Sequence, residues 1–192
     1  MPRYKEYDSQ TVLKRASEVF HRKGFEGTSM TDLVAATGLN TASMYKEFGS
    51  KEGLFESSLE LYNNTHILSM VQEMQATPNL ASLKAYLNNL QTYSTSNNFL
   101  GCLIMNNLAE KNIATSAALE HVENLCGRLE ELIEACLVQA QQDGDIPTYK
   151  DPKELANFII CFVHGLVLYA RMDDRKANMH GIFDQIENAI VS

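Results

Sequence analysis

The sequence predicts an all-α protein of about nine helices, in which a small N-terminal three-helix unit is joined by one long helix to a larger helical domain. Composition is the first reason. The 192 residues are 45% hydrophobic and 21% charged, as in an ordinary globular chain, and they include only 10 Gly and 4 Pro. The second reason is periodicity, because apolar residues recur with the spacing of a 3.6-residue helix and no alternating strand pattern competes with them.

Three short helices are expected near the N-terminus. The first covers residues 9–23, where the apolar side chains fall on one stripe. Ser29 has the side chain of an N-cap for a second helix, which stops at Gly38. Asn40 caps a third helix, which ends at Gly49. Three helices therefore fit within about 40 residues.

The remaining helices are longer and start with a connecting helix. Ser50 caps a fourth helix that is expected to run to about Ala76, because Thr77 precedes Pro78 and the residue before a proline avoids the helical region. We place the boundary inside this helix, giving domains of residues 1–52 and 53–192. The later helices are expected over residues 80–94, 101–112, 116–142, 152–173 and 176–190.

The charge is unevenly distributed along the chain. The net charge is -8, but residues 1–55 carry eight Lys/Arg and seven Asp/Glu, whereas residues 56–192 carry eight and seventeen. The acidic excess therefore lies outside the first domain, and any contact with nucleic acid must depend on local arrangement. The cations available in the first part are Arg3, Lys5, Lys14, Arg15, Arg22, Lys23, Lys46 and Lys51.

Several classes of protein are disfavoured. No run reaches the roughly 18 apolar residues of a membrane span and the start lacks the apolar segment of a signal peptide, so we expect a cytoplasmic protein with no membrane partner. The four cysteines show neither zinc-site spacing nor a secreted disulfide pattern, so no metal and no cofactor are expected. The five histidines share no catalytic motif with other residues, so we expect no enzyme activity.

Residues 29–48 have the form of a helix-turn-helix. Val34 lies four residues before Gly38 and ten before Met44, which are the positions where the two helices and their turn must touch. The outer face of the second helix carries small and polar groups that suit base edges and phosphates. These are Thr41, Ala42, Ser43, Tyr45 and Lys46.

The N-terminal part of the chain resembles the TetR family of transcriptional regulators over about residues 8–60. The resemblance is carried by two segments that are similar to the signature of that family, residues 24–33 (GFEGTSMTDL) and 38–52 (GLNTASMYKEFGSKE). The resemblance implies a double-stranded DNA operator, a small-molecule effector and a homodimer. By it Thr28 and Ser29 would anchor the second helix to phosphate, Thr41, Ala42 and Ser43 would face bases, and Tyr45, Lys46 and Lys51 would hold the backbone. The DNA-binding residues expected are Thr28, Ser29, Thr31, Asn40, Thr41, Ala42, Ser43, Tyr45, Lys46 and Lys51.

The sequence departs from the commonest pattern of that family in three places. Thr41 stands where Lys is frequent, Glu47 where His or Asn is frequent, and Val34 where a small Ala is usual. The sequence of the operator and the affinity for it therefore do not follow from the resemblance.

A ligand site is expected in the C-terminal part. Tyr62, His66 and Met70 recur every four residues along the fourth helix, where they could border a cavity, although core packing explains the same spacing. Cys102 begins a helix in a segment similar to the pocket wall of a subgroup of the family. A helix N-terminus would lower the pKa of its thiol, which makes Cys102 a candidate sensor of an electrophile or oxidant. The alternative is that Cys102 is a small buried side chain of the core. The ligand residues expected are Tyr62, His66, Met70, Tyr93, Cys102, Met105, Asn106, Cys126 and Phe162.

The last two helices are expected to form the dimer interface, since the resemblance implies a four-helix bundle between subunits. Residues 158–169 are apolar on nearly all sides, so this helix must be buried from more than one direction. Gly165 would let two helices approach closely, and His164 would line either the interface or the pocket. The interface residues expected are Phe158, Phe162, Gly165, Leu168, Tyr169, Met172, Phe183 and Ile186.

The function expected is therefore that of a repressor that binds a palindromic operator and is released from it by a small-molecule or thiol-reactive effector. A homodimer would place two recognition helices about 34 Å apart, one turn of DNA. The alternative is a helical dimeric ligand-binding protein without specific DNA binding, which Glu47 and the weak basic balance would favour.

Overall fold

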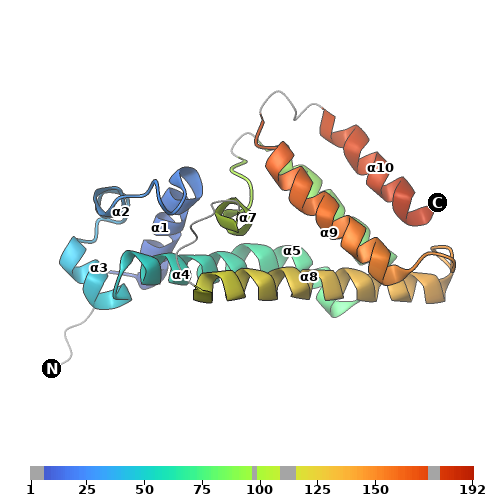
Figure 1. Ribbon diagram of the computed structural model, residues 1–192, viewed down its shortest axis with the longest axis horizontal. Coiled ribbons are helices and arrows are strands. Elements are labelled where there is room, and N and C mark those ends of the chain that lie inside the picture. The colour runs from blue at the N-terminus through green and yellow to red at the C-terminus, as the bar shows by residue number, and fades with distance from the viewer. Residues whose placement is uncertain (1–6, 97–98, 109–115, 173–177) are drawn as a thin grey trace. The chain divides into compact units, whose positions relative to one another are not determined.

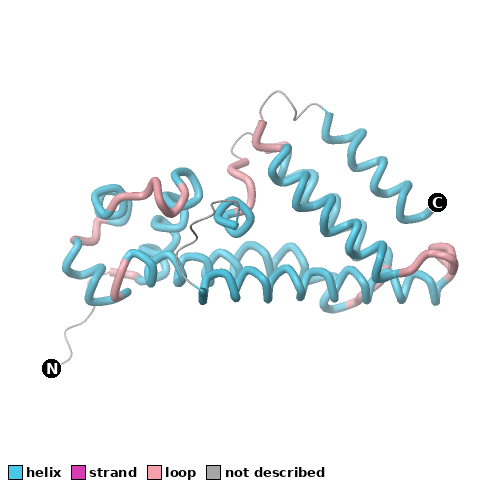
Figure 2. Tube along the Cα trace, viewed as in Figure 1, coloured by secondary structure: helices cyan, strands magenta, loops and turns pink. Residues whose placement is uncertain are grey.

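The computed structural model describes residues 7–96, 99–108, 116–172 and 178–192, and in these ranges it contains helices and loops only (Figures 1 and 2). Since α4, η1 and α5 follow one another without a break, the described part has nine helices when that run counts as one, and the predicted all-α fold is confirmed. The elements are α1 Ser9–Lys23, α2 Met30–Thr37, α3 Thr41–Phe48, α4 Lys51–Tyr62, the π-helix η1 Asn63–Ile67, α5 Leu68–Ala76, α6 Leu80–Ser94, α7 Leu103–Leu108, α8 Ser116–Asp143, α9 Pro152–Tyr169 and α10 Met179–Val191.

The helices fall into two compact units, which we call unit 1 and unit 2. Unit 1 consists of the chain up to Ile67 together with residues 102–120, and unit 2 consists of residues 68–101 and 121–192. In unit 1, α1 packs on α2, α4 and α7; in unit 2, α6 packs on α5 and α10. This division differs from the expected boundary after residue 52, because α4 packs along α1 instead of leaving the N-terminal helices. The boundary of the functional domains stays a prediction.

Three aromatic side chains form the centre of unit 1. Phe20 of α1, Phe25 of the following loop and Phe55 of α4 are all buried. The Phe55 ring lies 5.0 Å from each of the other two rings between centroids, in tilted or edge-on arrangements that aromatic rings prefer. This cluster fixes α4 against α1, and α3 in turn packs on α4.

Replacing Phe55 by Ala is expected to lower the free energy of unfolding by about 3–5 kcal/mol, because it removes a fully buried ring and leaves a cavity. Urea denaturation followed by circular dichroism measures this change. Phe55→Leu, which keeps more apolar volume, serves as the control and should lose clearly less. Equal losses in the two variants, or no loss in either, would contradict the aromatic core.

The expected fourth helix contains a π-helical segment that the sequence pattern did not predict. Residues 51–76 are helical throughout as expected, but α4 ends at Tyr62 and η1 occupies Asn63–Ile67. Asn63, Asn64 and Thr65 have short polar side chains that compete with the backbone for hydrogen bonds, and the Thr65 hydroxyl donates to the Leu61 carbonyl at 2.7 Å. We attribute the local change of helix type to this run.

Most helix ends agree with the expected ranges, and the differences have local causes. The helix expected from residue 101 begins at Leu103, because Gly101 has a φ of 88°, outside the helical region. The helix expected to reach residue 173 ends at Tyr169, where Ala170 caps it. The expected helical residues 109–112, 173 and 176–177, and the cations Arg3 and Lys5, lie outside the described residues.

Candidate DNA-binding surface and interior polar residues

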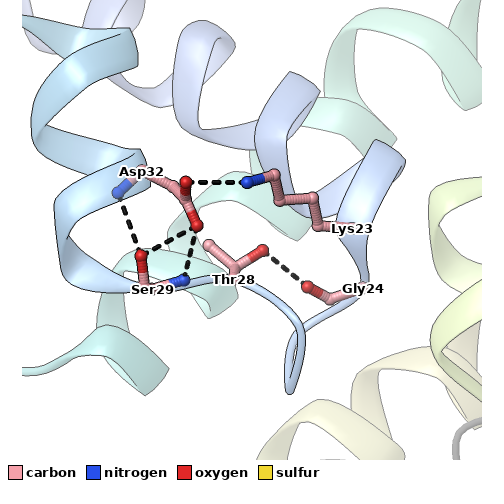
Figure 3. A network of polar contacts seen from close by, with 5 residues as sticks. All are labelled: Lys23, Gly24, Thr28, Ser29 and Asp32. Carbon is pink, nitrogen blue, oxygen red and sulfur yellow. Dashed lines mark hydrogen bonds and ion pairs between the residues drawn. The ribbon is translucent and has the colours of Figure 1, made fainter.

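The N-terminus of α2 is held by a capping box (Figure 3). The Ser29 hydroxyl accepts from the Asp32 backbone N–H at 3.1 Å, and the Asp32 carboxylate accepts from the Ser29 backbone N–H at 3.0 Å. Lys23 of α1 binds the same carboxylate at 2.7 Å. These contacts satisfy α2 donors that would otherwise lack a partner and tie α2 to α1. The signal for this box was present in the sequence, since Asp32 lies three residues after Ser29.

The hydrogen bond from Lys23, followed by those from Ser29, lowers the pKa of Asp32 from 3.8 to about 2. Because the folded-state pKa is depressed, this carboxylate stabilises the fold above pH 3.8 and the stabilisation is lost as the pH falls toward 2. We expect ¹³C NMR titration of the Asp32 carboxyl to give a pKa near 2. Lys23→Ala should raise that pKa, because it removes the largest cause. An ordinary pKa in the wild-type protein would show that the ion pair does not form.

The turn between α2 and α3 has the geometry of a helix-turn-helix. Gly38 takes a left-handed conformation with a φ of 73°, which ends α2 and which L side chains rarely adopt. Thr37 is buried, and its hydroxyl donates to the Leu33 carbonyl and accepts from the Leu39 N–H. The Asn40 side chain then accepts from the Ser43 N–H at 2.9 Å and starts α3. The turn is therefore fixed by its own side chains.

The third helix presents the polar face that the sequence predicts. Met44 is buried beneath it, and Tyr45 is 48% exposed. Ser43 is half-buried at the edge of this face. The exposed residues are Asn40, Thr41, Ala42, Tyr45 and Lys46, and Ser29 and Thr31 are exposed at the start of α2. Eight of the ten expected DNA-binding residues therefore lie at or beside the surface of α2 and α3.

The other two expected DNA-binding residues are Thr28 and Lys51. The Thr28 side chain is only 1% exposed and its hydroxyl donates to the Gly24 carbonyl at 2.6 Å (Figure 3), so the phosphate contact expected of this residue stays a prediction that its burial disfavours. The hydroxyl holds the loop before α2 instead. Lys51 is half-buried, with its Nζ 4.3 Å from the centre of the Phe25 ring, so its ammonium group is positioned by a cation–π contact.

Five of the nine expected ligand residues lie in unit 1. Tyr62 and His66 have ring centres 5.0 Å apart, and Tyr62 also lies 5.7 Å from His21 of α1. Asn106 of α7 is buried, while Met105 and Cys102 are half-buried. Burial lowers the pKa of His66, so its imidazole is neutral at pH 7.

Asn63 belongs with this group, although sequence reasoning did not single it out. Its side chain is 5% exposed, and the buried Oδ1 atom accepts no hydrogen bond. Such an atom costs free energy unless a donor reaches it. The π-helix that places Asn63 here could not be predicted from periodicity, which is why the residue was missed.

Cys102 does not have the low pKa that its place before a helix predicted. Burial raises the pKa of its thiol, and hydrogen bonds from the backbone of Met105 and Ile104 and from the Tyr62 side chain oppose this only in part. The helix that follows has six residues, so its dipole is small compared with the loss of water. The thiol is therefore protonated at neutral pH in this conformation.

The other four expected ligand residues lie in unit 2. Tyr93 packs edge-on against Phe99 at 5.1 Å, and Met70 is half-buried on α5. The Cys126 sulfur lies 4.0 Å from His164 Nε2, which places this half-buried histidine against α8. Phe162 packs edge-on against the Phe183 ring at 5.9 Å.

The residues expected at the dimer interface differ in how far they are exposed in the single chain. Phe183 and Ile186 of α10 are buried in the single chain, and their place in an interface with a partner stays a prediction. Phe162 and Tyr169 are half-buried. The exposed side of α10 is mainly polar, with His180, Asp184, Gln185 and Asn188.

Helix α9, in contrast, exposes apolar residues to solvent. Phe158 is 50% exposed, Leu168 is 42% exposed and Met172, just beyond the helix, is 47% exposed. Together with exposed Cys161 and Gly165 they recur at alternating intervals of three and four residues, the spacing of a helix–helix seam. We call residues 158, 161, 165, 168 and 172 the α9 stripe.

No group of three or more His, Cys, Asp and Glu side chains in the described part of the chain is arranged to hold a metal ion. No helix in the described ranges is long and apolar enough to cross a bilayer.

A helix-turn-helix that is fixed by its own caps and exposes a polar second helix defines a DNA-binding regulator. A family model described as bacterial regulatory proteins of the tetR family matches residues 12–57, and a model described as the tetracyclin repressor-like C-terminal domain matches residues 79–186. The chain belongs to the TetR family and is a DNA-binding transcriptional repressor. The resemblance found in residues 24–52 is thereby confirmed.

Individual relatives extend over most of the chain. The HTH-type transcriptional repressor ComR of Escherichia coli is 29% identical over 174 residues, which are 88% of this chain and 82% of ComR. A cysteine mutant of the regulator CifR, solved with 26-bp operator DNA, is 28% identical with a TM-score of 0.82 and 98% of each chain covered. Reduced NemR of E. coli has the same TM-score at 17% identity, covering 95% of this chain and 96% of NemR, so that likeness concerns the fold alone.

Proposed function

We propose that the protein acts as a homodimer that represses transcription by holding a palindromic operator with α3 and releases it when a small molecule binds. The observation that carries this proposal is the exposed face of α3. Its small and polar side chains Thr41, Ala42 and Tyr45 stand on a helix whose other side is buried through Met44. Such a face fits the major groove, where hydroxyl, methyl and phenol groups contact base edges and phosphates.

The dimer is proposed to form through the α9 stripe. The stripe has the spacing of a two-helix seam, and Gly165 at its centre carries no side chain to hold a second helix away. A two-fold axis at the stripe brings the same residues of two copies together, as closed dimers require. Two copies of α3 about 34 Å apart would then read the halves of a palindrome. The 26-bp operator bound by the relative CifR supports a duplex of this size.

The effector is proposed to bind near the π-helix of unit 1. Asn63 Oδ1 is buried and lacks a donor, and the rings of Tyr62 and His66, which contact each other in the same stretch of the chain, offer flat surfaces for a ligand. This combination suits a small molecule with an apolar or aromatic body and a hydroxyl or amide donor. Because the Cys102 thiol is protonated, a noncovalent effector is favoured over a thiol-reactive one. The π-helix interrupts the continuous run of α4, η1 and α5, and we propose that binding there changes the DNA-binding state through this run.

Selection of DNA from a randomised duplex pool tests this function. We expect a palindromic consensus with two half-sites one helical turn apart, bound by two copies of the chain. A protein that dimerises and binds small molecules but selects no consensus would instead support the alternative, a ligand-binding protein without specific DNA binding.

The proposed role as a repressor implies where in the cell the protein works and which activities it lacks. A regulator of this kind works in the bacterial cytoplasm, where the chromosome lies. The relatives are transcriptional regulators, and we propose that this chain likewise has no enzyme activity, cofactor or metal.

A further inference from the structure

A thiol of α8 and an imidazole of α9 lie close together in unit 2. The Cys126 sulfur is 4.0 Å from His164 Nε2, at the limit of the range in which a thiol hydrogen-bonds to a ring nitrogen. Both residues are half-buried, so each keeps part of its surface in solvent. The pair therefore combines a nucleophile with a base at a place that solvent reaches.

The imidazole has the protonation state of a base. Burial lowers the pKa of His164, so its ring is neutral at pH 7. A neutral imidazole accepts at one of its two nitrogens, and Nε2 accepts from the thiol in the tautomer that carries its hydrogen on Nδ1. A cysteine reacts as the thiolate, and a neighbouring base is one way to generate it. The separation of 4.0 Å is long, as such contacts often are before a reactant is bound.

The other three cysteines lack either the access or the base. Burial raises the pKa of the Cys102 and Cys136 thiols, which keeps both of them protonated at neutral pH. Cys161 is exposed, but in the described part of the chain no histidine is hydrogen-bonded to it. Cys126 is therefore the cysteine for which the structure provides a base, and Cys161 is the exposed thiol with which its reactivity can be compared.

We propose that Cys126 is a site of covalent modification by α,β-unsaturated carbonyl compounds, with His164 as the base that takes the thiol proton. The sulfur bonds to the β-carbon of the compound while the C=C π bond breaks, and the electron pair moves onto the carbonyl as an enolate. The proton passes from Sγ to His164 Nε2 and then to the α-carbon of the enolate. The product is a thioether, and no oxidant, reductant or leaving group takes part.

The class of reactant follows from the presence of one base. Displacement of a leaving group needs a further group to stabilise the departing charge, whereas an addition takes back the proton that the base removed. One imidazole is therefore enough to complete the addition. Cys126 lies in unit 2, whereas the noncovalent effector is proposed to bind in unit 1, so the two proposals are independent of each other.

The test measures how fast each cysteine of the full chain reacts with 2-cyclohexen-1-one at pH 7, by mass spectrometry of peptides from samples quenched at intervals. In the wild-type protein we expect Cys126 to react at least about 5-fold faster than Cys161, although Cys161 is more exposed. His164→Gln should slow Cys126 by at least about 10-fold, because glutamine cannot take the proton, and should leave the rate of Cys161 unchanged. His180→Gln is the matched control, since His180 is an exposed histidine of α10, and should change neither rate.

Two results would overturn the inference. One is a wild-type protein in which Cys161 reacts as fast as Cys126 or faster, and the other is an equal Cys126 rate in wild type and His164→Gln. The ranking within the wild-type chain needs no variant, so it decides the question even if His164→Gln is destabilised. Circular dichroism and thermal unfolding compare the variants with wild type. Since labelling is measured without DNA, its outcome is separate from the test of the repressor function.

Discussion

Ala42→Glu is expected to abolish specific operator binding, with a loss of affinity of about 100-fold or more. Ala42 is exposed on the outer face of α3, where a small side chain can lie against base edges. A carboxylate there meets the electronegative groove and phosphates, and the dimer would carry the defect in both half-sites. A cost of about 1–3 kcal/mol in each half-site gives this magnitude, since 1.4 kcal/mol is tenfold.

The measurement is a titration of labelled operator duplex with each protein at one fixed salt concentration. Ala81→Glu is the matched control, because Ala81 is also an exposed helical alanine but belongs to α6 of unit 2. It should bind operator as wild type does. Both variants should unfold at the wild-type temperature. If Ala42→Glu kept its affinity, α3 would not be the recognition helix.

Leu168→Asp is expected to convert the proposed dimer into a monomer, with the dimer dissociation constant raised by about 100-fold or more. Leu168 lies in the α9 stripe and is 42% exposed in the single chain, so the substitution leaves the fold of one subunit intact. In the proposed dimer it buries one unpaired carboxylate from each copy, at a cost of several kcal/mol. Operator affinity should fall with it, since one subunit holds only one half-site.

Light scattering after size exclusion measures the change directly, as a mass near 21.5 kDa in place of twice that value. Asn188→Asp is the control, because Asn188 is exposed on the polar side of α10. It should remain dimeric. A dimer that survives Leu168→Asp and dissociates with Asn188→Asp would move the interface from the α9 stripe to α10.

Much of the fold was predictable because local signals agreed with one another. Caps at Ser29, Asn40 and Ser50 and the left-handed Gly38 fixed the short N-terminal helices, and each appears where the sequence placed it. The face of α3 followed from the position of Met44, since one buried residue on a short helix determines which side chains face outward. Local signals did not reveal the π-helix, because the prediction of one continuous α-helix relied on the 3.6-residue period that the π-helix interrupts.

The side-chain environments were less predictable, because burial depends on partners far away in the sequence. Phe183 and Ile186 have the pattern of an interface helix, yet they are already buried in the single chain. Cys102 precedes a helix, but loss of water outweighs the helix dipole and raises its pKa. Glu47 stood out in the sequence only as a departure from the common pattern, and its contact with Tyr7 depends on the path of the chain before α1.

Base recognition by α3 is tested by comparing the binding of the wild-type protein to its selected operator duplex and to a duplex of the same composition with scrambled sequence. We expect at least about 1,000-fold tighter binding to the operator at physiological salt, as specific regulators show, with two chains on each duplex. Equal affinity for the two duplexes would mean that the polar face of α3 does not read bases and would contradict specific operator binding by this chain.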